Sequence, residues 1–234
     1  MEDQTNMRRP PPRKTMIALL RGGLDRIADF VEDRTERIFE STRKLDFGGR
    51  INRHALIVDD EATRASANPY EGTSARALRL LITEARRYML PFDNFIDVGS
   101  GKGKASIIAA RDGGFLHVSG VELSPPLVTI ASENARRAGV PNVEFICCDA
   151  SLHVLRPGST FVYINNPFDA PLLAKFMEVN AAHFTTYQSV IAYCHDWHRD
   201  VILDAGFETI QRDQQIKASI LRLRPEVRVV PIYC

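Results

Sequence analysis

The sequence predicts an α/β protein with a doubly wound, mostly parallel sheet and an N-terminal helical extension. Short apolar runs of strand length alternate with helical patterns from residue 70 onward, which is typical of repeated strand–helix–strand units. One of these strands, at residues 95–98, runs directly into glycines at every second position. With 234 residues and a 44% hydrophobic composition, the chain is long enough to bury one sizeable core.

The glycine-rich turn after this strand indicates a ligand site. Gly99, Gly101 and Gly103 are followed by helix-forming residues at 104–110. Glycine permits a left-handed backbone and leaves no β-carbon between the backbone and a ligand. The free N–H groups and the dipole at the start of the following helix favour a negatively charged group. Together these features predict a site for a nucleotide-type cofactor.

The spacing of the glycines excludes two common nucleotide motifs. A dinucleotide fingerprint requires glycine or alanine where Lys104 stands. A phosphate loop requires serine or threonine where Ala105 stands, and glycine where Val98 stands. What remains is an acid, Asp97, placed two residues ahead of the first of three alternating glycines.

Acids also close the next two expected strands. Glu122 ends the strand at residues 116–122, and an acid at a strand tip beside a glycine turn can accept hydrogen bonds from both hydroxyls of a ribose. Oxidoreductases use the same device, and the alternative is a solvated charge at a strand end. Asp149 follows the strand at residues 143–148, where the alternative is an N-cap for the next segment.

The fourth strand, at residues 161–164, completes an ordered set of motifs. It runs into Asn165-Asn166-Pro167-Phe168, which is close to the Asn-Pro-Pro-Tyr/Phe motif of many methyltransferases that act on nitrogen, with one proline instead of two. Taken together, residues 70–223 resemble the class I S-adenosylmethionine (SAM)-dependent methyltransferase superfamily. The resemblance implies a seven-stranded sheet of order 3-2-1-4-5-7-6 with one reversed strand at the edge, and it implies SAM as the cofactor.

The resemblance also implies which residues form the site. Contacts with the cofactor are expected from the glycine turn, the strand ends and a Tyr-x-x-Thr segment ahead of the first strand: Tyr70, Thr73, Asp97, Gly99, Ser100, Gly101, Gly103, Glu122, Leu123, Asp149, Ala150 and Asn165. Asp149 is expected to accept the adenine amine. Asn166, with backbone carbonyls near Pro167, is expected to orient the acceptor, and Phe168 to cover the transferring methyl group. The alternative is that these three residues form only a turn. No metal ligands are expected.

The other elements are predicted from hydrophobic periodicity and from residues that begin or end helices. Ser124 and Pro125 open a helix that Gly139 ends. A helix is expected at residues 74–89, capped by Thr73 or Ser74. After residue 168 the pattern predicts a helix at 170–184, a strand at 189–194, a helix at 197–205 and an antiparallel hairpin of strands 207–212 and 218–223. His195, Asp196 and His198 lie between two of these elements and are interpreted as solvated loop residues.

Composition limits the function. The net charge of +1 gives no electrostatic case for a nucleic-acid partner. The expected activity is SAM-dependent methylation of a nitrogen or oxygen nucleophile on a small molecule or a protein side chain. Two alternatives are a catalytically silent SAM-binding or scaffold protein and an NAD(P)-dependent oxidoreductase, against which the glycine spacing counts.

The chain divides into three expected regions. Residues 1–14 are polar, basic and proline-rich and are expected to be disordered. Residues 15–69 form the helical extension, with a helix at 15–40 that is a candidate self-association element and a short strand at 55–58. Residues 70–234 form the SAM-binding domain. No apolar run approaches the ~20 residues of a membrane span, and no signal-peptide core is present. Cys147 and Cys148 are expected as small apolar core residues in a buried strand, and the expected location is the cytoplasm.

Overall fold

A computed structural model describes residues 30–48, 73–88, 91–167, 169–214 and 217–227. It contains a seven-stranded sheet of order β3-β2-β1-β4-β5-β7-β6, as the sequence predicted. The strands are β1 (Asn94–Val98), β2 (His117–Glu122), β3 (Glu144–Cys147), β4 (Thr160–Ile164), β5 (Ser189–Cys194), β6 (Phe207–Asp213) and β7 (Ala218–Leu223). Strands β1 to β5 pair in parallel, and β7 is antiparallel to both β5 and β6.

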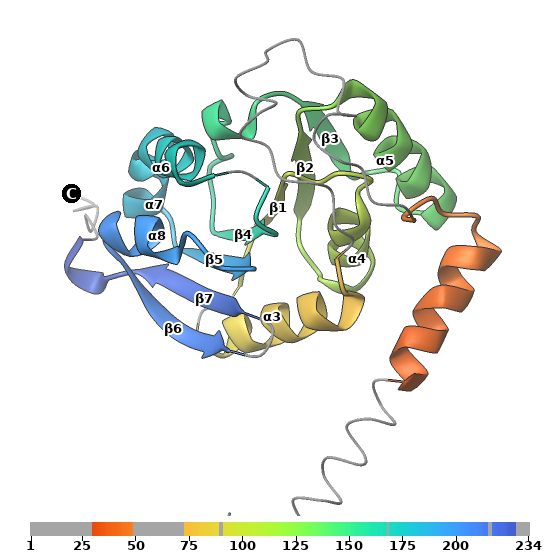
Figure 1. Cartoon of the computed structure of the whole chain (residues 1–234), viewed down its shortest axis with the longest axis horizontal. Helices are drawn as coiled ribbons and strands as arrows, with labels where there is room; N and C mark the ends of the chain where they lie inside the picture. Colours follow the sequence, from red (N-terminus) through yellow and green to blue (C-terminus); the bar gives the residue numbers. More distant parts are fainter. Residues whose placement is uncertain (1–29, 49–72, 89–90, 168, 215–216, 228–234) are drawn as a thin grey trace, which may run out of the picture.

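Helices cover both faces of the sheet (Figure 1). They are α3 (Ala75–Tyr88), α4 (Lys104–Asp112), α5 (Pro125–Ala138), α6 (Ala170–Val179), α7 (Ala181–Thr186) and α8 (Arg199–Asp204). Phe95 of β1 belongs to an apolar cluster with Leu78 of α3 and Ile107 of α4. Its neighbour Ile96 belongs to the opposite cluster, which includes Phe176 of α6. Successive side chains of a strand point to opposite faces, so β1 contributes to both layers.

The predicted helix boundaries of α3 and α5 are confirmed with their caps. The side chain of Ser74 accepts a hydrogen bond from the backbone of Ala77 (3.3 Å). Ser124 is the N-cap of α5, with proline in the first turn. Gly139 ends α5 in the left-handed conformation at φ 82°, where glycine carries no steric penalty.

Three details of the prediction are wrong. Asp196 is not a solvated loop residue, because it is buried and its carboxylate accepts hydrogen bonds from Arg212 and Ser219. The helix expected at residues 170–184 is divided at Asn180 into α6 and α7. The side chain of Asn180 bonds the backbone of His153 (2.9 Å) and of Leu155 (2.9 Å), which fixes it away from regular helix geometry. Cys147 is exposed and Cys148 is half-buried, because β3 is an edge strand and its residues are covered on fewer sides than those of the central strands.

The helix of residues 30–42 lies beside α4 and α5 (orange in Figure 1). Its Glu36 accepts hydrogen bonds from Arg79 of α3 (2.9 Å) and Arg111 of α4 (3.0 Å). Glu40 pairs with Lys104 (2.6 Å). The expected disordered tail at 1–14, the first part of the expected helix and the short strand at 55–58 lie outside the described residues.

Candidate functional site

The glycine turn lies at the carboxyl end of β1. Gly99, Gly101 and Gly103 all have positive φ, at 77°, 53° and 81°. The backbone N–H groups of Gly99 and Ser100 both donate to the carbonyl of Val121 in β2 (2.9 Å). The turn is closed by a bond from the N–H of Gly103 to the carbonyl of Ser100 (2.8 Å). The glycines therefore supply the left-handed backbone that holds this loop between two strand ends.

Glu122 fixes the loop from the end of β2. One carboxylate oxygen accepts the N–H of Gly101 and the other accepts the N–H of Ser124, each at 2.9 Å. Only 8% of Glu122 is exposed, so it is not a solvated charge at a strand end. Burial raises the pKa of Glu122, and the backbone hydrogen bonds oppose that shift.

Asp97 lies deeper in the same place, with 3% of its surface exposed. The hydroxyl of Ser106 in α4 donates to its carboxylate (3.1 Å). Burial raises the pKa of Asp97 to about 7; the Ser106 hydrogen bonds lower it, and the charge of Glu122 raises it. Ser106 was not predicted as a site residue. A polar residue in the first turn of the helix after the loop could have indicated a contact with the end of β1.

The Asn-Pro turn after β4 touches the glycine loop directly. A β-carbon added to Gly99 would lie 2.3 Å from the β-carbon of Pro167, which is far inside van der Waals contact. Only glycine at position 99 therefore lets the two turns approach this closely. The loop and the turn come together because β1 and β4 are adjacent and parallel, so their carboxyl ends meet at one edge of the sheet.

The side chains of the turn are held by residues that follow or end β5. Asn166 is buried, has φ 46° and accepts a hydrogen bond from the hydroxyl of Tyr193 (3.0 Å). The side-chain oxygen of Asn165 lies 3.0 Å from Nδ1 of His195, which itself has φ 51°. Left-handed backbone at non-glycine residues is uncommon and gathers at functional sites. Tyr193 was not predicted as a site residue, because it lies within a run of apolar residues that indicates only a buried strand.

The remaining predicted residues are placed as follows. Thr73 accepts a hydrogen bond from the hydroxyl of Tyr163 (3.4 Å). Asp149 caps the 3₁₀ helix η2 (Ala150–Leu152) through a bond from the N–H of Ser151 (2.9 Å). The capping geometry that the sequence left open for Asp149 is thus present. Leu123 follows Glu122 directly and is half-buried. Tyr70 and Phe168 lie outside the described residues.

The chemistry of this edge fits SAM. Two buried carboxylates with raised pKa, Asp97 and Glu122, suit a cationic ligand because its charge favours their ionised forms. The loop glycines carry no β-carbon, and one added to Gly103 would lie 2.6 Å from the ring of Phe145. The buried hydroxyl of Ser100 has no hydrogen-bond partner among the described residues.

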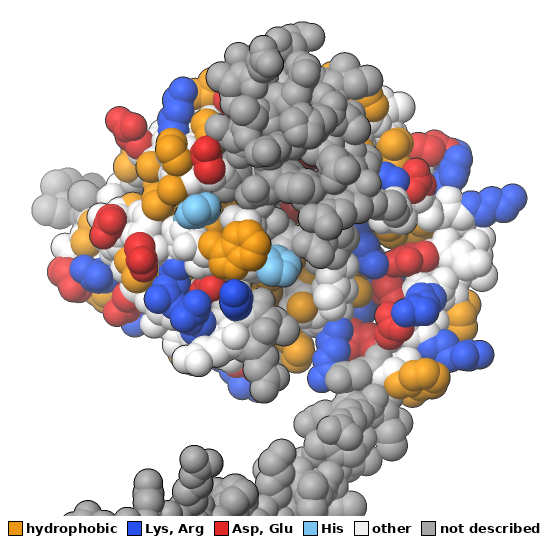
Figure 2. Space-filling model, viewed as in Figure 1, with side chains coloured by type: hydrophobic (Ala, Val, Ile, Leu, Met, Phe, Trp, Pro, Cys, Tyr) orange, Lys and Arg blue, Asp and Glu red, His pale blue; other side chains and the backbone are white. Residues whose placement is uncertain are grey.

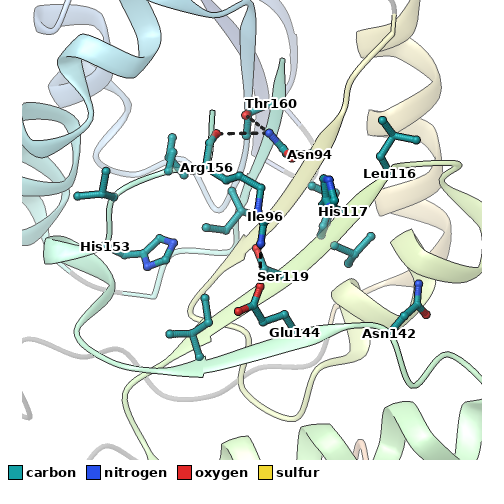
Figure 3. A pocket seen from close by; sticks show the side chains of 15 residues that line it. Asn94, Ile96, Leu116, His117, Ser119, Asn142, Glu144, His153, Arg156 and Thr160 are labelled. Atoms are coloured by element: carbon teal, nitrogen blue, oxygen red, sulfur yellow. Dashed lines mark hydrogen bonds and ion pairs between the residues drawn. The ribbon is translucent and has the colours of Figure 1, made fainter. Parts of the chain in front are cut away.

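A separate cavity of about 360 Å³ lies toward the amino ends of the strands (Figure 3). It is lined by side chains of β1, β2, β3 and β4 and by the connection that follows η2, including Asn94, Ser119, Glu144 and Arg156. Since the glycine loop and the Asn-Pro turn follow the carboxyl ends of β1 and β4, this cavity is not part of their site. Within the described ranges, no cluster of three or more potential metal ligands occurs, and no helix is both long and apolar enough to cross a membrane.

Comparisons with known proteins agree with this geometry. Residues 92–190 match the family described as "Methyltransferase domain". The chain is 32% identical over 95 residues to ribosomal protein L11 methyltransferase of Allorhizobium ampelinum, covering 40% of this chain and 31% of that protein. It is 34% identical over 74 residues to release factor glutamine methyltransferase of Nitratidesulfovibrio vulgaris, covering 31% of this chain and 25% of that protein. The match thus spans less than a third of either relative.

The fold is shared with a solved structure, that of TrmN from Thermus thermophilus. The TM-score is 0.52 at 15% identity, with 65% of this chain and 49% of that chain covered. Strands β1 to β4 and the glycine loop between β1 and α4 lie within the residues that match the family. Residues 92–190 are therefore similar to a methyltransferase domain, within a sheet of the order expected for class I SAM-dependent methyltransferases, and this similarity supports SAM as the cofactor.

Proposed function

We propose that this chain transfers a methyl group from SAM to a nitrogen or oxygen nucleophile. The observation that carries the proposal is the contact between Gly99 and Pro167. A cofactor loop that touches the turn expected to hold the acceptor puts the two reactants side by side. Holding two reactants in a fixed orientation lowers the barrier of a displacement reaction, because the entropy of bringing them together has already been lost on binding.

The glycine loop and the two acids hold the cofactor. Glu122 accepts the ribose hydroxyls while its backbone partners, Gly101 and Ser124, keep its carboxylate in place. Asp97 lies below the loop as a negative charge for the cationic end of the cofactor. Asp149 and the neighbouring Ala150 contact the adenine, and this role is compatible with capping because a carboxylate accepts several hydrogen bonds. The same proposal includes contacts from Tyr70, Thr73, Ser100, Leu123 and Asn165.

The Asn-Pro turn orients the acceptor. When bound, SAM supplies a methyl group on a positively charged sulfur, which departs as a neutral thioether. The chain's part is to align the nucleophile and to stabilise the positive charge that develops on it. Asn166 and the carbonyls beside Pro167 have this role, and Phe168 covers the reacting atoms. The bond from Tyr193 supports the assignment because it holds the Asn166 amide in one orientation.

We propose a protein side chain or a small molecule as the acceptor. Both curated relatives described above carry names of enzymes that act on proteins. Basic and acidic side chains are interspersed across the described part of the face in Figure 2, whereas nucleic-acid binding calls for a concentrated basic surface. We propose the cytoplasm as the location, since the three described cysteines are free thiols.

The experiment is transfer of label from methyl-labelled SAM to fractionated cell extract, with Asn166→Ala as the matched variant. The proposal expects label in the protein or small-molecule fraction with the native chain. The variant should bind SAM within about twofold of the native affinity and transfer about 10- to 1000-fold more slowly, the scale of losing one positioned polar group. Tight SAM binding with no transfer to any fraction would instead identify a silent SAM-binding protein.

A further inference from the structure

Residues 46–48, which lie in the extension before α3, are bonded directly to the cofactor loop. The ammonium of Lys102, between two loop glycines, donates to the carboxylate of Asp46 (2.6 Å) and to the carbonyl of Gly48 (2.7 Å). Asn134 of α5 bonds both Asp46 and Lys102. Its amide donates to the carbonyls of Asp46 and Lys102 (3.0 Å each), and its oxygen accepts the N–H of Asp46 (2.9 Å).

Two of the three residues in these contacts, Lys102 and Asn134, are buried. The side chain of Lys102 is 8% exposed and Asn134 is 1% exposed. Phe47, between the two residues that bind Lys102, is itself part of the apolar core on the α3–α5 side of the sheet. A buried ammonium is costly unless it is paired and hydrogen-bonded. Among the described residues, both partners of the Lys102 ammonium come from residues 46–48, so these residues fix the position of Lys102.

The position of Lys102 in turn decides the course of the loop. Its neighbours Gly101 and Gly103 both have left-handed backbone, at φ 53° and 81°, and glycine alone does not select that conformation over others. Fixing the Lys102 carbonyl through Asn134 sets the orientation of the peptide group that leads into Gly103. The N–H of Gly101, on the other side, is the group that holds Glu122.

We propose that Asp46, Lys102 and Asn134 form a positioning cluster that holds the glycine loop in its SAM-binding conformation. The helical extension is then a working part of the cofactor site, and not only a cover over α4 and α5. The cluster acts through the loop and does not itself touch the cofactor. The inference rests on the proposed function in one respect, namely that this loop binds SAM.

The test compares Asp46→Asn, Lys102→Met and the double variant in the full chain. Asp46 has a side chain that is 54% exposed, so its amide replacement is not expected to prevent folding. S-adenosylhomocysteine is titrated by calorimetry, the melting temperature is recorded, and amide hydrogen exchange is measured at residues 99–103 without ligand. We expect each single variant to weaken binding about tenfold and to speed exchange in the loop. The double variant should add little to either single effect, because both changes remove the same Lys102–Asp46 ion pair.

Arg43→Met is the matched control. Arg43 belongs to the same extension and donates to the carbonyl of Arg137 (3.2 Å) at the end of α5, away from the loop. This variant should leave the dissociation constant and the loop exchange within twofold of the native values. Native binding and native loop exchange in both Asp46→Asn and Lys102→Met would overturn the positioning cluster. Absence of binding by the native chain would contradict the proposed function instead, and the exchange measurement would still decide the cluster.

Discussion

The hydroxyl of Tyr193, at the end of β5, donates a hydrogen bond to the side-chain oxygen of Asn166 at 3.0 Å. Burial raises the pKa of Tyr193 to about 12, an effect that a backbone hydrogen bond from His198 opposes and the charge of Asp196 increases. The phenol therefore stays protonated and remains a donor throughout the neutral range. A residue of β5 thus fixes the orientation of the Asn166 amide, which lies in the turn after β4.

Tyr193→Phe should separate this orientation from folding. The ring keeps its packing and only the hydroxyl is lost, so the free energy of unfolding should fall by about 0.5–1.5 kcal/mol, the net worth of one hydrogen bond. Transfer should slow by about 3- to 30-fold while the SAM dissociation constant stays within twofold. Label transfer and calorimetry on one preparation check this, and an unchanged transfer rate would show that Asn166 is oriented without Tyr193.

Glu122→Gln should weaken SAM binding by about 1–3 kcal/mol, because ligand hydroxyls lose a charged acceptor and the loop loses its carboxylate partner. Glu144→Gln is the matched control, since Glu144 lines the cavity toward the amino ends of the strands. Its effect on the dissociation constant should be below twofold. Equal binding by both variants, with native circular dichroism, would remove Glu122 from the cofactor site.

Asp97 should make both stability and SAM affinity depend on pH. The pKa of Asp97 is about 7 in the folded protein against an ordinary value of 3.8. The folded chain therefore holds a proton that the unfolded chain releases, and this contribution to stability is full below about pH 4 and is lost as the pH rises toward 7. A cationic ligand favours the ionised carboxylate, so SAM affinity should rise about tenfold between pH 6 and pH 8.

The comparison variant for this effect is Asp97→Asn, in which the hydroxyl of Ser106 can still donate to the side chain. Any pH dependence that comes from SAM itself is shared by the two proteins. The difference between their affinity profiles should therefore isolate Asp97. Parallel profiles from pH 6 to pH 8 would mean that the Asp97 proton is not coupled to binding.

Gly103→Ala and Gly48→Ala should differ sharply although the chemical change is the same. Gly103 has φ 81°, and an added β-carbon would lie 2.6 Å from the Phe145 ring. Gly48 has nothing within 4 Å of an added β-carbon. Backbone strain alone should cost the Gly103 variant about 1–3 kcal/mol, with weaker SAM binding, and the Gly48 variant should stay within about 0.5 kcal/mol of native. Urea unfolding of both variants provides the measurement.

The sequence predicted correctly those parts of the fold that depend on the residue pattern of a single short segment. Strand β5 was bounded correctly because it is a continuous apolar run, and Gly139 marked the end of α5 because its conformation suits glycine. The break at Asn180 was missed because its cause is a contact with His153 and Leu155, more than 20 residues away. The exposure of Cys147 was missed because the residues of a strand do not indicate whether that strand lies at the edge of the sheet.

The same division applies to the site. The glycine loop and the acids at the strand ends were predicted because their spacing in the sequence is characteristic. They lie near Asn166 because β1 and β4 are adjacent and parallel. Tyr193 and the Asp46 contacts with Lys102 have no such spacing. They join segments 27 and 56 residues apart, and only the folded chain brings them together.

Direct titration of the native chain with SAM and, separately, with NADH tests the central claim of a SAM site at the carboxyl ends of β1 to β4. We expect saturable heat with SAM and with S-adenosylhomocysteine, and none with NADH at the same concentrations. Saturable binding of NADH with no heat from SAM would contradict it.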